Sequence, residues 1–128
     1  MAEKKVLVVD DEVAILKMFK KAFSSKGYTV RSAESAEEAL EVLKQDSIHV
    51  MFLDLNLPGM NGVELCRQLR EKRPIDIIYA VTGYTSLFEL AECRGAGFDD
   101  YFHKPVEVKE LLNAAQDAFE KIERWKKR

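Results

Sequence analysis

Five short apolar runs alternate with five stretches of helical periodicity along this chain. Apolar runs of this length, rich in β-branched residues, are typical of strands that are buried on both faces. Strict alternation of such strands with helices requires right-handed crossovers, so it predicts a parallel sheet with helices on both faces. The expected strands are Lys5–Val9, Tyr28–Ser32, His49–Leu53, Ile77–Val81 and Asp99–Phe102, of which the last carries the weakest pattern.

The segments between these runs carry the spacing and the end signals of helices. Ser35 and Glu38 form a capping box at the start of the second helix. Gly27 is expected to close the first helix, and Gly95 with Gly97 the fourth. The last helix is defined by apolar residues at Val108, Leu111, Leu112, Ala115, Phe119 and Ile122.

The alternation runs through all 128 residues without a linker. We therefore expect one α/β domain over residues 1–128, a doubly wound (βα)5 fold of the flavodoxin-like kind with strand order 2-1-3-4-5. Its core should cover about residues 4–122, with residues 123–128 as a basic helix end or linker.

Charge and cysteine usage exclude several classes of protein. Twenty Lys and Arg against 22 Asp and Glu leave a net charge of -2, which argues against a protein that wraps nucleic acid. Cys66 and Cys93 form no metal-binding pair. No apolar run is long enough for a signal peptide or a membrane span. We expect a cytoplasmic protein that contacts neither nucleic acid nor membrane.

Chemically active side chains follow four of the five expected strands. Asp10 and Asp11 come after the first strand, Asp54 after the third, Thr82 after the fourth and Lys104 after the fifth. In a parallel sheet of order 2-1-3-4-5, the first and third strands are neighbours at the switch point, where ligands bind. The three carboxylates are therefore expected to converge there.

Three carboxylates in one cleft repel one another unless a cation lies between them. Neither His nor Cys accompanies the acids, so the ligand set favours Mg²⁺, with Mn²⁺ as the alternative, over zinc. A carboxylate beside Mg²⁺ with a lysine opposite is typical of phosphoryl transfer, in which Lys104 neutralises phosphoryl oxygens. The Thr82 hydroxyl can donate to one of those oxygens.

Each residue alone also has a purely structural interpretation. Asp11 before a helix is commonly an N-cap, Asp54 before a Pro-Gly loop a turn residue, and Lys104 a surface residue. Those interpretations do not explain why four strands all end in groups that suit one phosphoryl site. The joint pattern therefore favours a site.

The sequence resembles the receiver domains of bacterial two-component response regulators, the CheY-like family. The resemblance covers essentially the whole chain in order, and the segment Asp54–Gly62 is its most specific part. The matching segments are Val8–Glu12, Asp54–Gly62, Val81–Tyr84 and Gly95–Tyr101, the last running into Lys104–Pro105.

The resemblance implies a role for each residue of the expected site. Asp54 would accept a phosphoryl group from a histidine kinase or phosphotransfer protein. Asp11, Asp54 and the backbone carbonyl of Asn56 would bind Mg²⁺, and Asp10 would act directly or through a water. Lys104 would pair with the phosphoryl group. Such a protein is not an enzyme in the usual sense, because it catalyses only its own phosphoryl transfer and dephosphorylation.

The resemblance also implies a conformational switch. Thr82 would move toward the phosphoryl group and Tyr101 would turn inward into the space that Thr82 leaves. This would alter the face of the fourth helix, fifth strand and fifth helix, for a downstream protein, a missing effector domain or a homodimer. Lys104–Pro105 is expected to be cis.

Two positions beside the site are expected to tune the lifetime of the acyl phosphate. Asn56 follows the acceptor by two residues, and Tyr84 follows Thr82 by two. Tyr84 is bulky and has no carboxylate to orient a water, so we expect a comparatively long-lived acyl phosphate. The competing interpretation is that Tyr84 contacts a partner protein.

Two other classes of function remain as alternatives. A Mg²⁺-dependent phosphatase with an aspartyl nucleophile would need an acid at position 56, where Asn56 stands. A flavodoxin-like cofactor-binding module would need a phosphate-binding loop after the first strand, where Asp10 and Asp11 would repel phosphate.

The near-neutral total charge conceals a basic C-terminal end. Residues 120–128 hold five basic and two acidic groups, a net charge of +3. Basic residues suit the last turn of a helix. The alternative is a linker to an effector domain or a patch for an acidic partner, with Trp125 as the anchor of either.

Overall fold

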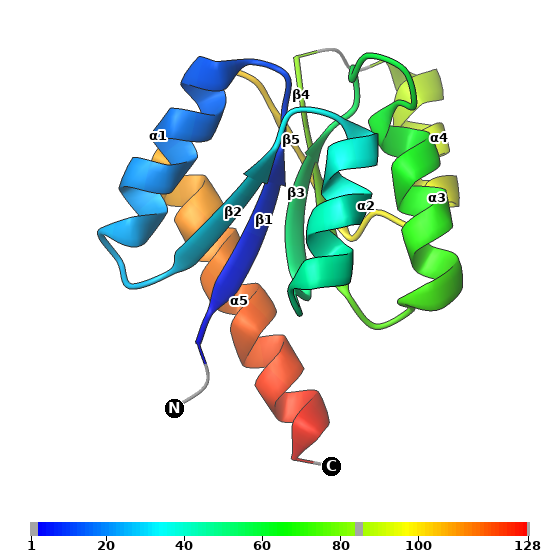
Figure 1. Ribbon diagram of the computed structural model, residues 1–128. Helices are drawn as coiled ribbons and strands as arrows, with labels where there is room; N and C mark the ends of the chain where they lie inside the picture. Colours follow the sequence, from blue (N-terminus) through cyan, green and yellow to red (C-terminus); the bar gives the residue numbers. More distant parts are fainter. Residues whose placement is uncertain (1–2, 84–85, 128) are drawn as a thin grey trace.

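The computed structural model describes residues 3–83 and 86–127 as five strands that alternate with five helices (Figure 1). Every expected strand and helix is present, and each strand starts and ends within one residue of its expected position. In chain order the elements are β1 (Lys5–Val9), α1 (Val13–Ser24), β2 (Thr29–Ala33), α2 (Ala36–Gln45), β3 (Val50–Asp54), α3 (Gly62–Lys72), β4 (Ile77–Thr82), α4 (Leu87–Ala96), β5 (Asp100–His103) and α5 (Val108–Lys126).

The strands form one parallel sheet in the order β2-β1-β3-β4-β5. This confirms the doubly wound flavodoxin-like fold with strand order 2-1-3-4-5. Strands β1 and β3 are direct neighbours, with Val8 opposite Phe52, and β3 pairs with β4 so that Asp54 lies opposite Val81. The ends of these three strands therefore meet at one edge of the sheet, at the top of Figure 1.

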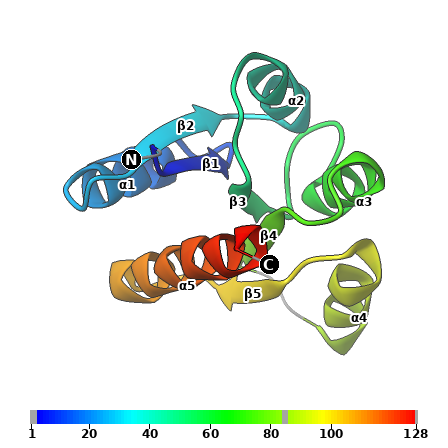
Figure 2. The same cartoon turned by 90° about the horizontal axis from the view of Figure 1, so that it is seen from below.

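Helices cover both faces of the sheet, as the alternation predicts. Seen from below, α1 and α5 lie on one side and α2, α3 and α4 on the other (Figure 2). The α1 and α5 side is rich in aromatic rings, where Phe52 lies 5.4 Å from Phe19 and 5.2 Å from Tyr79 between ring centroids. No helix in the described ranges is long and apolar enough to cross a membrane.

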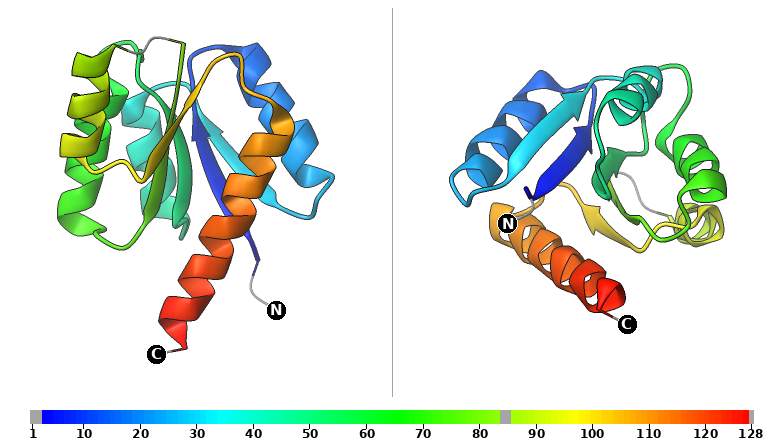
Figure 3. Two further views of the ribbon diagram at one scale, coloured as in Figure 1. Left: turned by 180° about the vertical axis from the view of Figure 1, so that it is seen from behind. Right: turned by 60° about the horizontal axis from the view of Figure 1, so that its bottom comes forward.

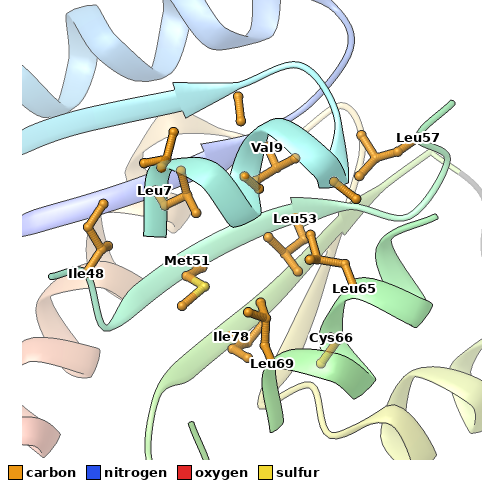
Figure 4. Close-up of a cluster of buried hydrophobic side chains, with 14 of the residues drawn as sticks. Leu7, Val9, Ile48, Met51, Leu53, Leu57, Leu65, Cys66, Leu69 and Ile78 are labelled. Atoms are coloured by element: carbon orange, nitrogen blue, oxygen red, sulfur yellow. The ribbon is translucent and has the colours of Figure 1, made fainter. Parts of the chain in front are cut away.

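The opposite face is packed with aliphatic side chains (Figure 4). Fully buried residues of β1 and β3 meet residues of α3 there, and burial of each large aliphatic side chain contributes about 2 kcal/mol. The labelled members include Leu7, Val9, Met51, Leu53, Leu65, Cys66 and Leu69.

Helix ends follow the expected signals with two differences. The Ser35 hydroxyl accepts a hydrogen bond from the Glu38 amide, but the Glu38 carboxylate accepts from the amide of Glu34 instead of Ser35. Only Gly97 ends α4, with a left-handed φ of 103°, whereas Gly95 lies inside the helix. Gly97 satisfies the last carbonyls of α4 in the geometry that glycine adopts without a Cβ clash.

Both cysteines are buried packing residues, and we expect their thiols to be unreactive in the folded protein. Burial raises the pKa of Cys66 to about 11 and raises the pKa of Cys93 as well. The thiolate is the reactive species. Cys66 should therefore react with an aromatic disulfide reagent on the order of a hundred times more slowly in the folded protein than in the unfolded protein. The measurement is thiol release with and without denaturant, and rapid reaction in the folded protein would contradict it.

Candidate functional site

Three carboxylates gather at the carboxyl ends of β1 and β3. Oxygen atoms of Asp10, Asp11 and Asp54 all lie within 4.8 Å of one another, as the sequence predicts. Asp10 and Asp54 are only 2% and 4% exposed, whereas Asp11 is exposed. Because the buried strands end at these residues, two of the carboxylates are held away from water and the third lies at the opening.

Asp11 is not the N-cap of α1, which is the purely structural role that the sequence allows for it. The N-cap residue of α1 is Glu12, whose side chain makes no capping hydrogen bond. Asp10 instead stabilises this turn, because its Oδ1 accepts a hydrogen bond from the Glu12 amide at 2.9 Å. The Asp11 carboxylate is thus left at the mouth of the cluster.

Lys104 brings a positive charge into the carboxylate cluster from the connection between β5 and α5. Its Nζ lies 2.9 Å from Asp10 Oδ2 and 3.7 Å from Asp54 Oδ2. The Lys104 amide donates to the Thr82 carbonyl at 2.7 Å, and the peptide bond from Lys104 to Pro105 is cis. The hydrogen bond to Thr82 holds the backbone from which the Lys104 side chain reaches back across the ends of the strands.

The charges in the cluster are unevenly balanced. Burial, together with the negative charge of Asp10, raises the pKa of Asp54 above its ordinary value, although Lys104 opposes the shift. Burial alone would lower the pKa of Lys104, but the hydrogen bond to Asp10 and the charge of Asp54 raise it. One lysine therefore holds its charge yet does not fully compensate the acids.

The loop after β3 is shaped around Asp54. The Asn56 amide donates to Asp54 Oδ1 at 3.2 Å, and the Gly62 amide donates to the Leu55 carbonyl at 3.0 Å. A Cβ at Gly62 would lie 2.9 Å from the carbonyl carbon of Asp54, so the start of α3 packs directly on this backbone. Asn61 caps α3 by accepting from the Glu64 amide.

The donor set suits a hard divalent cation. Carboxylate oxygens from three residues converge, and a partly exposed opening leaves room for water ligands, the combination that Mg²⁺ prefers. Burial and, after it, the charge of Asp10 raise the pKa of Asp54, and a bound cation would stabilise the negative charge that both effects disfavour. The exposed Asn56 follows Asp54 by two residues and lies beside the cluster.

The remaining predicted residues lie on β4 and β5. Thr82 is 1% exposed at the end of β4, adjacent in sequence to Val81, which pairs with Asp54. Tyr101 lies on β5 and is 39% exposed. Tyr84 lies outside the described residues.

Two residues contribute to the site in ways that the sequence patterns do not indicate. Glu12 approaches Lys104 Nζ at 3.5 Å from the exposed side, as a further acid that competes for the lysine. Gly62 is the second, because its lack of a side chain is what allows α3 to pack on the backbone of Asp54. The Asn-Gly pair signals a turn but not this contact.

Comparison with known proteins places this geometry in a family. The family model described as response regulator receiver domain matches residues 6–116. The curated response regulator MprA of Mycobacterium ulcerans is 38% identical over 108 residues, which cover 84% of this chain and 47% of that protein. The chain thus spans about half the length of the curated relatives it matches.

Solved structures agree with the sequence match. A CheY-like receiver domain from Methanospirillum hungatei superposes with a TM-score of 0.91 at 33% identity, covering 96% of this chain and 98% of that one. The chemotaxis protein CheY4 of Vibrio cholerae gives a TM-score of 0.86 at 29% identity, covering 91% and 99%.

Proposed function

The chain belongs to the response regulator receiver domain family of two-component systems, and from this we propose that it is a switch whose phosphoryl acceptor is Asp54. The observation that carries the proposal is the position of Lys104, whose ammonium lies between two buried carboxylates at 2.9 and 3.7 Å. A partly buried lysine beside two buried acids, at the carboxyl ends of the strands of a parallel sheet, suits transfer of a phosphoryl group to one of those acids.

In the proposed reaction an Asp54 oxygen attacks the phosphorus of a phosphohistidine on a kinase or phosphotransfer protein. The new P–O bond forms as the P–N bond breaks; the bonding electron pair stays on that nitrogen, and the ring, protonated on its other nitrogen, leaves as neutral imidazole. Lys104 neutralises charge on the phosphoryl oxygens, and the Asn56 amide holds the other Asp54 oxygen at 3.2 Å. The protein would catalyse only this transfer and the later hydrolysis.

Mg²⁺ fits the acidic cluster, with Asp10, Asp11, Asp54 and the Asn56 carbonyl as its proposed protein ligands. Bound there, it would supply positive charge to the phosphoryl oxygens. Asp10 is also tied to Lys104 and the Glu12 amide, so it positions the lysine as well as contributing charge.

The switch is proposed to run from Thr82 to Tyr101. Thr82 is buried beside the acceptor strand, whereas Tyr101 on β5 is 39% exposed. Phosphorylation would draw Thr82 toward the phosphoryl group and let Tyr101 turn inward, remodelling the surface of α4, β5 and α5. A downstream protein, an effector domain or a second copy would read that surface.

The proposal is tested by chemical phosphorylation with a small donor. We expect acetyl phosphate and Mg²⁺ to add one phosphoryl group, which intact-mass measurement detects and which peptide mapping after borohydride reduction places at Asp54. A chelator should abolish the modification. Modification that persists without a divalent cation, or that maps to another residue, would refute the assignment.

A further inference from the structure

The apolar stripe of α5 continues beyond the sheet that covers it. The apolar residues of this stripe recur every three or four positions. Those that pack on the sheet, such as Leu111, Ala115 and Ala118, are buried. Ile122 is half-buried and Trp125 is 69% exposed. Viewed from behind, the last turns of α5 extend past the lower ends of the strands (Figure 3). The helix thus presents the end of its apolar stripe to solvent.

This exposed end forms one wall of a groove, named here the α5 groove. The other wall is the connection between α3 and β4, where Ile75 is 79% exposed. The groove has a volume of about 520 Å³ and is lined by His49, Pro74, Ile75, Ile77, Ile122 and Trp125. Because β3 and β4 begin here and end at Asp54 and Thr82, the α5 groove lies at the opposite end of the sheet from the phosphorylation site.

The acids at the α5 groove already have cationic or ring-nitrogen partners. Asp76 is 3% exposed and is bound by Arg73 Nε at 2.5 Å and His49 Nδ1 at 2.8 Å. Asp99 Oδ2 accepts from Arg70 at 2.6 Å. The negative charges of Asp76 and Asp99 are therefore already compensated by these arginines.

Lysines flank the apolar wall on both sides. Lys121 and Lys126 also line the α5 groove, next to Ile122 and Trp125. Lys126 lies 3.8 Å from a carboxylate oxygen of the exposed Glu123, and an exposed ion pair at this distance contributes little. The groove is therefore an apolar slot with a basic rim.

Heptad positions identify the kind of chain that fits this slot. With Ile122 at position a and Trp125 at position d, Lys121 is at g and Lys126 at e. A second copy packed in parallel would set Lys121 against Lys126, and an antiparallel copy would set each lysine against itself. Both arrangements place like charges together, so a second copy is disfavoured.

We propose that the α5 groove binds an amphipathic helix of a different protein, one with large apolar residues at positions a and d and Asp or Glu at e and g. The apolar residues would pack on Trp125, Ile122 and Ile75, and the acids would pair with the two lysines. This site goes beyond the phosphoryl switch, because it lies at the other end of the sheet and requires no change at Asp54.

The test uses Trp125 as its own reporter, since it is the only tryptophan of the chain. The probes are synthetic helical peptides of about 14 residues, near the shortest length that is helical in water, with Leu at a and d. One carries Glu at e and g, the second Lys, and the third has the composition of the first in scrambled order. We expect only the first to shift Trp125 emission to shorter wavelength in a saturable way.

Charge reversal tests the lysines directly. The double variant Lys121→Glu, Lys126→Glu should bind the Glu peptide at least about tenfold more weakly and should now bind the Lys peptide. Its matched control, Lys17→Glu with Lys20→Glu on α1, changes the net charge equally and should keep the original preference. Circular dichroism checks that each variant is folded.

Three results of the peptide experiments would overturn the proposal. They are the absence of a saturable shift with the Glu peptide, equal binding of the scrambled peptide, and an unchanged preference in the double variant. A shift of Trp125 emission that depends on protein concentration without any peptide, together with dimers in sedimentation, would identify a second copy as the occupant. That result would also overturn the proposal.

Discussion

Asp54→Asn should lose all phosphorylation by acetyl phosphate and at the same time gain stability. The amide cannot act as the nucleophile, so no acyl phosphate forms. It also removes one negative charge from a cluster in which three carboxylates lie within 4.8 Å and two of them are buried. In a chelating buffer at neutral pH we therefore expect a higher urea midpoint for Asp54→Asn than for the wild type.

The gain in stability should depend on pH in a defined direction. Burial and Asp10 raise the pKa of Asp54 above the ordinary value of 3.8. The contribution of a group with a raised pKa is fully present below its unfolded pKa and is lost as the pH rises through its folded pKa. The stability difference between Asp54→Asn and the wild type should therefore be small below about pH 3.8 and grow above it. Added Mg²⁺ should narrow the difference, because only the wild type offers it all three carboxylates and it should therefore stabilise the wild type more.

Asp46→Asn is the matched control for this substitution. The Asp46 carboxylate binds Lys5 at 2.5 Å and Arg31 at 3.1 Å at the far end of the sheet, and the hydrogen bond from Lys5 lowers its pKa. Its stabilising contribution is present above its unfolded pKa and is lost as the pH falls through the folded pKa. This variant should lose stability at neutral pH and phosphorylate normally. Loss of stability in Asp54→Asn, or phosphorylation of it, would contradict the prediction.

The architecture could be predicted because it depends on patterns that repeat. Each buried strand is an apolar run, and the alternation with helices leaves few topologies. The identities of the residues at the strand ends then predicted the cluster of Asp10, Asp11 and Asp54, since the sheet order brings the ends of β1 and β3 together.

What escaped the sequence was set by distances between segments far apart in the chain. Nothing in the pattern indicates that Lys104 approaches Asp10 more closely than Asp54, because that depends on the path of the backbone after β5. Gly95 and Gly97 look equivalent as helix-ending residues, yet only Gly97 has a positive φ. The α5 groove likewise arises where the end of one helix passes a loop about fifty residues earlier in sequence.

Gly62→Ala should destabilise the protein by about 3 kcal/mol and impair phosphorylation of Asp54. The added Cβ would meet the carbonyl oxygen of Asp54 and would lie 2.9 Å from its carbonyl carbon and 3.0 Å from Leu55 Cα. These are backbone atoms of a buried strand end, which cannot rotate away as a side chain would. Relief of the clash requires α3 to move off the loop that carries Asp54.

Gly95→Ala provides the opposite result from the same chemical change. Gly95 lies inside α4, and a Cβ there would have no neighbour within 4 Å in the part of the chain that the structure describes. Alanine should raise stability by about 0.5–1 kcal/mol, since it restricts the unfolded chain and favours a helix. Urea unfolding of both variants, with the rate of acetyl phosphate labelling, separates the two effects. If Gly62→Ala were as stable and as readily phosphorylated as Gly95→Ala, the contact between α3 and the backbone of Asp54 would not constrain the site. A large loss in Gly62→Ala alone would mean that the acceptor is held in place by close packing of the start of α3 on its backbone, which a side chain at position 62 prevents.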